Sequence, residues 1–311
     1  MQRSRDRSNF GSRILLARLA GRQLALVVPL LAAGCGDGRV WVLGQSEPRG
    51  WQFGEARPLL ALASPAKTDN PTLSADLLEL YFTSERAGTA DIFVAERSDP
   101  DDAFGTPRRV DALSTSGTET SPIVSADALT LYWASDRAGG VGDLDIWLAT
   151  RPERNGTWSS PLNVRTLNSE AKDLPRLPGL HDTIMPLSSD RGSRGYYAVL
   201  FARSSDDAHS FAAPEPVPEL EFAGASTVDG FLTDDGLTLF YVTGPAIGAA
   251  DMFVASRRTP SEPFEHFAPL DALNTPSDER DPWLSADRTR FFFASNRSGV
   301  YTIYEAEVLA R

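Results

Sequence analysis

The chain has 311 residues, of which 41% are hydrophobic and 23% are charged, a composition typical of a folded protein that buries a large core. Six of its 30 basic residues and one of its 42 acidic residues precede Gly34, so the remainder carries 24 basic and 41 acidic residues and a net charge of −17. A field of this sign repels phosphate backbones, which argues against a nucleic acid as partner.

The N-terminus has the organisation of a secretory signal peptide. Arginines up to Arg22 precede an apolar stretch at residues 24–33, which Gly34 and Cys35 follow. The apolar stretch is too short to span a bilayer, which takes about 20 residues of helix. We therefore expect residues 1–34 to direct export and to be removed.

The small residues before Cys35, the only cysteine, resemble the lipobox of bacterial lipoproteins, although Ala32 stands where leucine is commoner. The resemblance implies cleavage before Cys35 and lipidation of its thiol, and more than one acyl chain gives a stable membrane anchor. The alternative is a buried free thiol, a redox liability in an exported protein. Residues 35–52 would be a tether. Gly36 is not the aspartate that signals inner-membrane retention in some bacteria, so we expect the periplasmic or surface face of the outer membrane.

From residue 53 onward, one pattern recurs five times with a period of 51 to 54 residues. An aromatic residue is followed nine positions later by leucine, in the pairs Phe53 and Leu62, Phe104 and Leu113, Trp158 and Leu167, Phe211 and Leu220, and Phe264 and Leu273. Between the pairs lie short apolar runs separated by Ser-Ala-Asp and Asp-Arg-x-Gly turns, which predict consecutive antiparallel strands. A repeat of this length predicts an array of blades.

The copies differ in how well they keep the pattern. The first has its turns at residues 74–76 and 85–88, and the second and fifth repeat it closely. The fourth changes its second turn, and the third is the most degenerate, with Met185 and Pro186 where an aromatic strand is expected. The serine and aspartate of each first turn are expected to bond backbone groups, and the arginine of each second turn to pair with an acid.

The elements Pro-x-x-Ser-Ala-Asp, Tyr-Phe-x-Ser, Asp-Arg-x-Gly and Asp-Ile-Phe/Trp resemble the WD40-like β-propeller repeat of the TolB type, over residues 53–311. The resemblance implies an all-β fold, a five-bladed propeller of four-stranded antiparallel blades. Residues 53–64 match the segments that link blades elsewhere, so we expect this N-terminal strand to complete the last blade and close the ring. Nothing resembles the additional N-terminal domain of TolB or a prolyl oligopeptidase hydrolase domain.

In such propellers the innermost strands line the axis, and ligands usually occupy one mouth of it. The residues at which these strands begin form a mixed-charge set, which we take as the hypothetical binding site: Asp69, Glu119, Lys172, Asp173, Arg280 and Asp281. The alternative is that these charges merely solvate a channel entrance.

Five-bladed propellers include glycosidases, in which a carboxylic acid and a carboxylate flank the substrate, and Asp69, Glu119 and Asp281 could take these roles. The three histidines are widely separated, and the sequence has no metal pattern, nucleophile elbow or phosphate-binding loop, so we expect no metal and no cofactor. The sequence favours a monomeric, lipid-anchored binding or scaffold protein of the cell envelope, with a protein or glycan partner, over the alternative of a carbohydrate-active enzyme.

Overall fold

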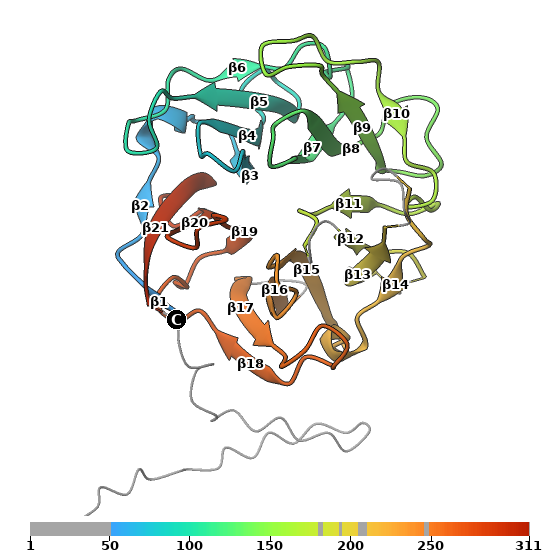
Figure 1. Ribbon diagram of the computed structural model, residues 1–311, viewed down its shortest axis with the longest axis vertical. Coiled ribbons are helices and arrows are strands. Elements are labelled where there is room, and N and C mark those ends of the chain that lie inside the picture. Colours follow the sequence, from blue (N-terminus) through green and yellow to red (C-terminus); the bar gives the residue numbers. More distant parts are fainter. Residues whose placement is uncertain (1–50, 180–182, 193–194, 205–209, 246–248, 311) are drawn as a thin grey trace, which may run out of the picture. The chain divides into compact units, whose positions relative to one another are not determined.

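The computed structural model describes residues 51–179, 183–192, 195–204, 210–245 and 249–310. The predicted signal peptide, Cys35 and most of the predicted tether lie outside these residues. The described strands form five antiparallel sheets around a common axis (Figure 1). The prediction of an all-β, five-bladed propeller is confirmed.

Each of the first four blades has four strands, with the innermost strand first in sequence. Blade one comprises β3 (Thr68–Leu73), β4 (Glu79–Ser84), β5 (Asp91–Glu96) and β6 (Arg108–Arg109). Blade two comprises β7 (Glu119–Val124), β8 (Thr130–Ser135), β9 (Asp145–Thr150) and β10 (Leu162–Asn163). Blade three comprises β11 (Asp173–Pro175), β12 (Ile184–Ser189), β13 (Ala198–Arg203) and β14 (Glu215–Pro216). Blade four comprises β15 (Ala225–Leu232), β16 (Thr238–Pro245), β17 (Asp251–Ser256) and β18 (His266–Pro269).

Blade five joins the two ends of the described chain. It contains β19 (Glu279–Leu284), β20 (Arg290–Ser295) and β21 (Thr302–Ala310), and β21 pairs with both β1 (Gln52–Phe53) and β2 (Arg57–Pro58). Figure 1 shows the N-terminal strands, in blue, beside β21, in red. The N-terminal segment therefore closes the ring, as expected, and it covers the edge that β21 would otherwise expose.

Aromatic packing holds this closure. The ring of Phe53 lies 5.0 Å from that of Phe291 in β20, and the ring of Trp51 lies 5.0 Å from that of Phe240 in β16. Trp51 thus reaches across to blade four from the end of the segment expected to be a tether.

The repeated leucine and the repeated arginine form one interaction. In four blades the arginine guanidinium donates to the carbonyl of the leucine that precedes the innermost strand, in the pairs Arg86 and Leu62, Arg137 and Leu113, Arg191 and Leu167, and Arg297 and Leu273. In blade four, which lacks this arginine, the Thr227 hydroxyl bonds the Leu220 carbonyl at 2.7 Å. Each blade therefore ties its own innermost strand to the segment that enters it.

A second arginine secures the outer part of three blades. Its Nε donates to a turn carbonyl, and its guanidinium lies 4.2–4.6 Å from the centre of the repeated aromatic ring, in the pairs Arg97 and Phe104, Arg151 and Trp158, and Arg257 and Phe264. This stacking accounts for the fixed place of the aromatic residue in these three copies of the repeat.

The innermost strands carry a β-bulge in every blade but the third. Pairing shifts by one residue there, and the bulged position has a positive φ of 53–57° in Asn70, Ser121, Asp229 and Asp281. Asparagine and aspartate tolerate this left-handed conformation better than most residues. In blade three the pairing from Asp173 to Pro175 is continuous. The bulges decide which side chains reach the axis.

Candidate functional site

Five polar side chains, one from each blade, meet around the propeller axis. The Ser121 hydroxyl donates to Asn70 Oδ1 at 2.7 Å, and the backbone N–H of Asn70 donates to Asp281 Oδ2 at 3.1 Å. Arg176 Nη2 contacts Asp281 Oδ1 at 3.5 Å and also bonds Asp229 Oδ1. We call these five residues the axial ring. Except for Asn70, each is less than 10% exposed, so the ring is a buried polar layer across the channel.

The pKa values of the two carboxyl groups of the axial ring are shifted in opposite directions. Burial alone would raise the pKa of Asp229, but the Arg176 guanidinium outweighs it and lowers that pKa. Burial, together with the nearby Asp229 and Asp69 carboxylates, raises the pKa of Asp281 well above its usual range despite Arg176 and Lys67. Two like charges beside one arginine cannot both be compensated, so the second carboxyl favours its neutral form.

Of the six residues expected at the mouth, Asp69, Arg280 and Asp281 gather at the axis. Asp69 is 2% exposed, and its carboxylate binds Lys67 Nζ at 2.6 Å. Burial would lower the pKa of Lys67, but Asp69 outweighs it and the pKa is raised. The Arg280 guanidinium lies 5.6 Å from the centre of the Tyr301 ring and 3.5 Å from Asp278 Oδ2.

Glu119 and Asp173 lie within their own blades and are fully buried. Glu119 accepts from Thr115 N at 2.8 Å, Thr115 Oγ1 at 2.7 Å and Ser135 Oγ at 2.9 Å, and its Oε1 lies 3.2 Å from Arg137 Nη2. Asp173 makes the equivalent contacts with Ser169, Ser189 and Arg191. Both carboxylates are used in holding their blade together.

Lys172, the last of the six, is half-buried next to Asp173. Its backbone N–H donates to Asp190 Oδ1 at 2.8 Å. Glu279, which the sequence-based set omitted, makes the same contacts in blade five as Glu119 does in blade two.

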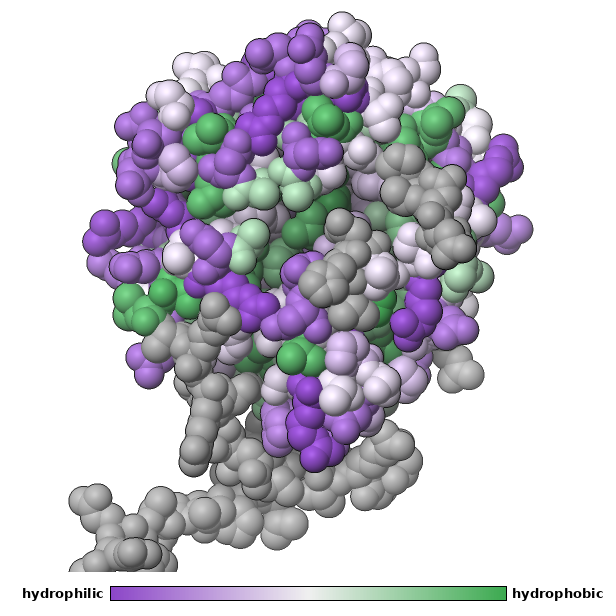
Figure 2. Space-filling view, viewed as in Figure 1, coloured by the Kyte–Doolittle hydropathy of each residue, from purple (hydrophilic) through white to green (hydrophobic). Residues whose placement is uncertain are grey.

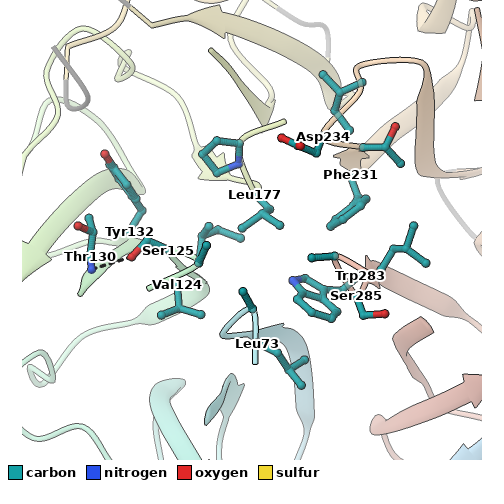
Figure 3. Close-up of a pocket in the computed structure, with 18 of the residues that line it drawn as sticks. Leu73, Val124, Ser125, Thr130, Tyr132, Leu177, Phe231, Asp234, Trp283 and Ser285 are labelled. Carbon is teal, nitrogen blue, oxygen red and sulfur yellow. Dashed lines mark hydrogen bonds between the residues drawn. The ribbon is translucent and has the colours of Figure 1, made fainter. Parts of the chain in front are cut away.

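A cavity of about 660 Å³ opens on the other side of the axial ring, where the innermost strands end. Its walls are mainly apolar, and each blade contributes to them: Leu73, Ile123, Val124, Tyr132, Leu177, Phe211, Phe231, Leu232, Trp283 and Leu284. Figure 3 shows Leu73, Leu177, Phe231 and Trp283 converging from different blades. In the space-filling view, hydrophobic residues gather in a hollow near the centre of the ring (Figure 2).

Polar residues of the Ser-Ala-Asp turns form the rim of the cavity, among them Ser125, Asp127, Ser285 and Arg288. Within the turn, Ser125 Oγ donates to Asp127 Oδ1 at 2.6 Å, and the backbone N–H of Thr130 donates to Ser125 Oγ at 2.9 Å. The prediction that these serines and aspartates order the turn is confirmed, and the rim is therefore preformed.

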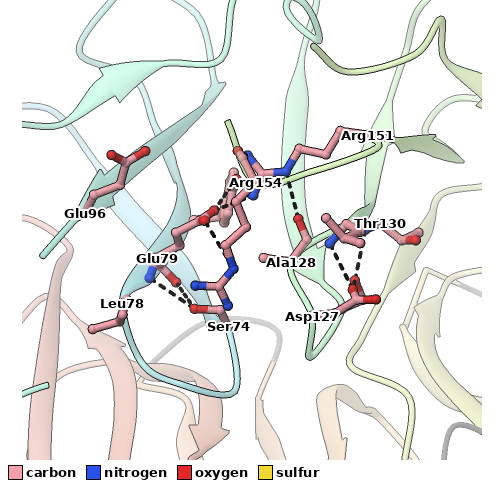
Figure 4. A network of polar contacts seen from close by, with 12 residues as sticks. Ser74, Leu78, Glu79, Glu96, Asp127, Ala128, Thr130, Arg151 and Arg154 are labelled. Carbon is pink, nitrogen blue, oxygen red and sulfur yellow. Dashed lines mark hydrogen bonds and ion pairs between the residues drawn. The ribbon is translucent and has the colours of Figure 1, made fainter. Parts of the chain in front are cut away.

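An inter-blade ion pair supports the rim between blades one and two (Figure 4). Arg151 Nη2 binds Glu79 Oε2 at 2.6 Å, and Arg151 Nε donates to the Ala128 carbonyl at 2.8 Å. Arg154 extends the contact to Asp76 Oδ2 at 2.5 Å. The two turns that carry Ala75 and Ala126 into the cavity wall are thereby held at a fixed separation.

A second cavity, of about 20 Å³, lies between the larger one and the axial ring. It shares Ile123, Leu177, Phe231 and Trp283 with the larger cavity, and it also touches the ring residues Asn70, Arg176 and Asp281. The deep end of the apolar cavity is therefore polar.

Sequence reasoning placed the site at the opposite mouth and missed this cavity. Several of the residues that form it stand just before the Ser-Ala-Asp turn or its counterpart, and the variation of one repeat position between Ile123, Phe231 and Trp283 was the available signal.

Within the described part of the chain, no helix is long and apolar enough to cross a membrane. Nor do the described histidine, aspartate and glutamate side chains come together in a group of three or more that could hold a metal ion.

No protein-family model matches the chain, and no curated protein sequence matches it. Solved structures do match. TolB from Acinetobacter baumannii aligns with a TM-score of 0.50 and 14% identity, over 81% of this chain and 57% of that protein. This chain thus spans little more than half the length of that TolB.

Two glycoside hydrolases are also similar. An α-L-arabinofuranosidase from Podospora anserina, solved in complex with cellotriose, aligns with a TM-score of 0.57 and 13% identity, over 85% of this chain and 98% of the enzyme. An endo-arabinase from Bacteroides thetaiotaomicron has the same TM-score and identity, over 84% and 98%. At these identities the likeness shows the β-propeller fold, and any argument about function must come from the site itself.

Proposed function

We propose that this propeller is a binding module of the cell envelope whose cavity receives an apolar segment of a partner protein. The single observation that carries the proposal is the cavity of about 660 Å³, lined with apolar side chains from all five blades and opening at one end of the axis. Ligand sites are commonly concave, of this volume, mostly apolar and preformed.

The charge of the molecule supports a partner with basic residues beside its apolar segment. Without the first 34 residues the chain carries a net charge of −17, and Asp127 stands exposed on the rim. Complementary charge speeds association and helps to select the partner.

The cavity favours a protein segment over a glycan. Sugars need many hydrogen-bond partners, whereas the deep walls here are made by Leu73, Ile123, Leu177 and Phe231. An aliphatic or aromatic side chain of a partner would leave water and pack against these apolar walls, which is favourable.

The envelope location rests on the sequence of residues 1–35, and we propose that a lipidated Cys35 holds the propeller at the outer membrane. We propose that it acts there as a monomer, because β1 and β2 complete the last blade and the ring needs no strand from a second copy.

A glycosidase remains the second candidate because the axis holds Asp69, Asp229 and Asp281, of which the last has a raised pKa, as a general acid requires. The similar folds of the arabinofuranosidase and the endo-arabinase agree with it. Against it, Arg176 contacts both Asp229 and Asp281, and Glu119 is buried in its blade. Hydrolysis of arabinan or arabinoxylan that is lost in Asp281→Asn would establish the enzyme and reject the binding module.

Site-specific photo-crosslinking in intact envelopes tests the proposal. A photoreactive residue replaces Ala286, which is exposed on the cavity rim, and in a matched protein it replaces Ala87, an exposed alanine in the turn after β4 at the opposite face. We expect a protein adduct from position 286 that is absent from position 87. Ala75→Trp, which fills the rim from blade one, should abolish that adduct. Equal adducts from both positions, or an adduct that survives the filled rim, would reject the cavity as the binding site.

A further inference from the structure

Two buried N–H groups at the deep end of the cavity have no acceptor among the residues that the structure describes. They are Trp283 Nε1 and Arg176 Nε, and these residues are 4% and 8% exposed. Figure 3 shows the indole nitrogen of Trp283 turned toward the centre of the cavity. A buried donor without an acceptor is costly, so in a native protein it calls for a specific explanation.

The cavity supplies that explanation for Trp283 and Arg176 alone. The indole N–H groups of Trp133 and Trp147 are also without an acceptor in the described ranges, but neither residue is among those lining either cavity. Trp283 lines both cavities, and Arg176 lines the smaller one beneath. A group that enters from the mouth and passes the apolar walls therefore meets these two donors.

Charge decides which kind of acceptor fits. The Arg176 guanidinium already contacts Asp229 and Asp281, and the Asp69 carboxylate lies near the same point of the axis. A ligand carboxylate or phosphate would add a negative charge beside the Asp229 and Asp69 carboxylates, and Arg176 is already paired with Asp229. An uncharged carbonyl accepts the same hydrogen bond without this repulsion.

We propose that the deep end of the cavity is a subsite for an uncharged hydrogen-bond acceptor, with Trp283 Nε1 as its principal donor. The subsite rests on the proposed function and narrows it, because the apolar group of the partner must then end in a carbonyl, such as a side-chain or backbone amide.

Three small probes of similar shape test the subsite on the purified protein. Acetophenone carries a carbonyl, α-methylstyrene replaces the carbonyl with a methylene group, and benzoate carries a charged carboxylate. Binding is followed by the indole N–H signals of the ¹⁵N-labelled tryptophans, and the Trp283 signal is the one lost in Trp283→Phe.

We expect acetophenone, and not α-methylstyrene, to move the Trp283 N–H signal downfield. Trp283→Phe should weaken the binding of acetophenone about two- to tenfold more than the binding of α-methylstyrene, as expected for one lost hydrogen bond. If Trp283→Phe weakened the binding of the two probes equally, or if both probes shifted the signal equally, the subsite would be overturned. Binding of α-methylstyrene would in that case still support the apolar cavity.

The other outcomes are also decisive. Tighter binding of benzoate than of acetophenone would contradict an uncharged acceptor. Absence of binding by acetophenone and α-methylstyrene would reject the cavity itself, and with it the proposed function. If Trp283→Phe does not fold, the comparison needs no assignment: a downfield shift of one indole N–H signal with acetophenone and not with α-methylstyrene supports the subsite, and its absence overturns it.

Discussion

Replacing Glu119 with glutamine tests whether this carboxylate stabilises the fold or binds the partner. The side chain is fully buried, and its two oxygens face the Thr115 N–H and hydroxyl, the Ser135 hydroxyl and the Arg137 guanidinium at 2.7–3.2 Å. Glutamine keeps the shape and removes the charge, which leaves Arg137 without its carboxylate.

The expected loss of stability is about 3 kcal/mol, the lower end for breaking a buried ion pair. The lower end applies because Arg137 keeps its bonds to the Leu113 carbonyl and the Ser135 hydroxyl. For a domain of this size the loss corresponds to a decrease of about 6–12 °C in Tm.

Thermal unfolding followed by circular dichroism measures the effect, and crosslinking from position 286 measures partner binding in the same protein. Glu279→Gln is a matched repeat of the experiment in blade five, since Glu279 makes equivalent bonds to Thr275, Ser295 and Arg297. The control is Glu153→Gln, at an exposed position where a change within about 0.5 kcal/mol is expected. An unchanged Tm together with lost binding would refute the structural role and restore Glu119 to the binding site.

Three further predictions concern the axis, the closure and the anchor. The lowered pKa of Asp229 adds stability that is lost as pH falls through that pKa, whereas the raised pKa of Asp281 removes stability as pH rises from about 4 toward its own pKa. Urea unfolding across pH 4–8 should therefore show that Asp229→Asn lowers the free energy of unfolding at pH 7. Asp281→Asn should instead reduce the fall of this free energy as pH rises. A similar loss of stability at pH 7 in both variants would contradict the opposite pKa shifts. Deleting residues 53–64 should lower the Tm severely, because β1 and β2 cover β21, and an unchanged Tm would reject the closure. Cys35→Ala should abolish labelling by a radioactive fatty acid in growing cells, and labelling that survives would reject the anchor.

The repeat made the architecture predictable from the sequence. Five leucines at a fixed distance from five aromatic residues gave the number of blades, and the match of residues 53–64 to the linking segments gave the closure. The same repeat identified the turns, because Ser-Ala-Asp and Asp-Arg-x-Gly work through local hydrogen bonds that any copy shows.

The site was only partly predictable, since it depends on which way side chains turn at the axis. The bulges at Asn70, Ser121, Asp229 and Asp281 insert one residue into each innermost strand, and one residue reverses the face on which a side chain lies. The unbulged third blade contributes Arg176 instead. The partners of Arg176 lie 53 and 105 residues away in the chain, and no local pattern connects them.

A crystal structure of the protein with the segment of the partner crosslinked at position 286 would test the central claim most directly. We predict an apolar side chain in the cavity among Leu73, Phe231 and Trp283, with a carbonyl at the Trp283 indole N–H. A segment bound instead at the opposite mouth, against Lys67 and Arg280, would contradict the account.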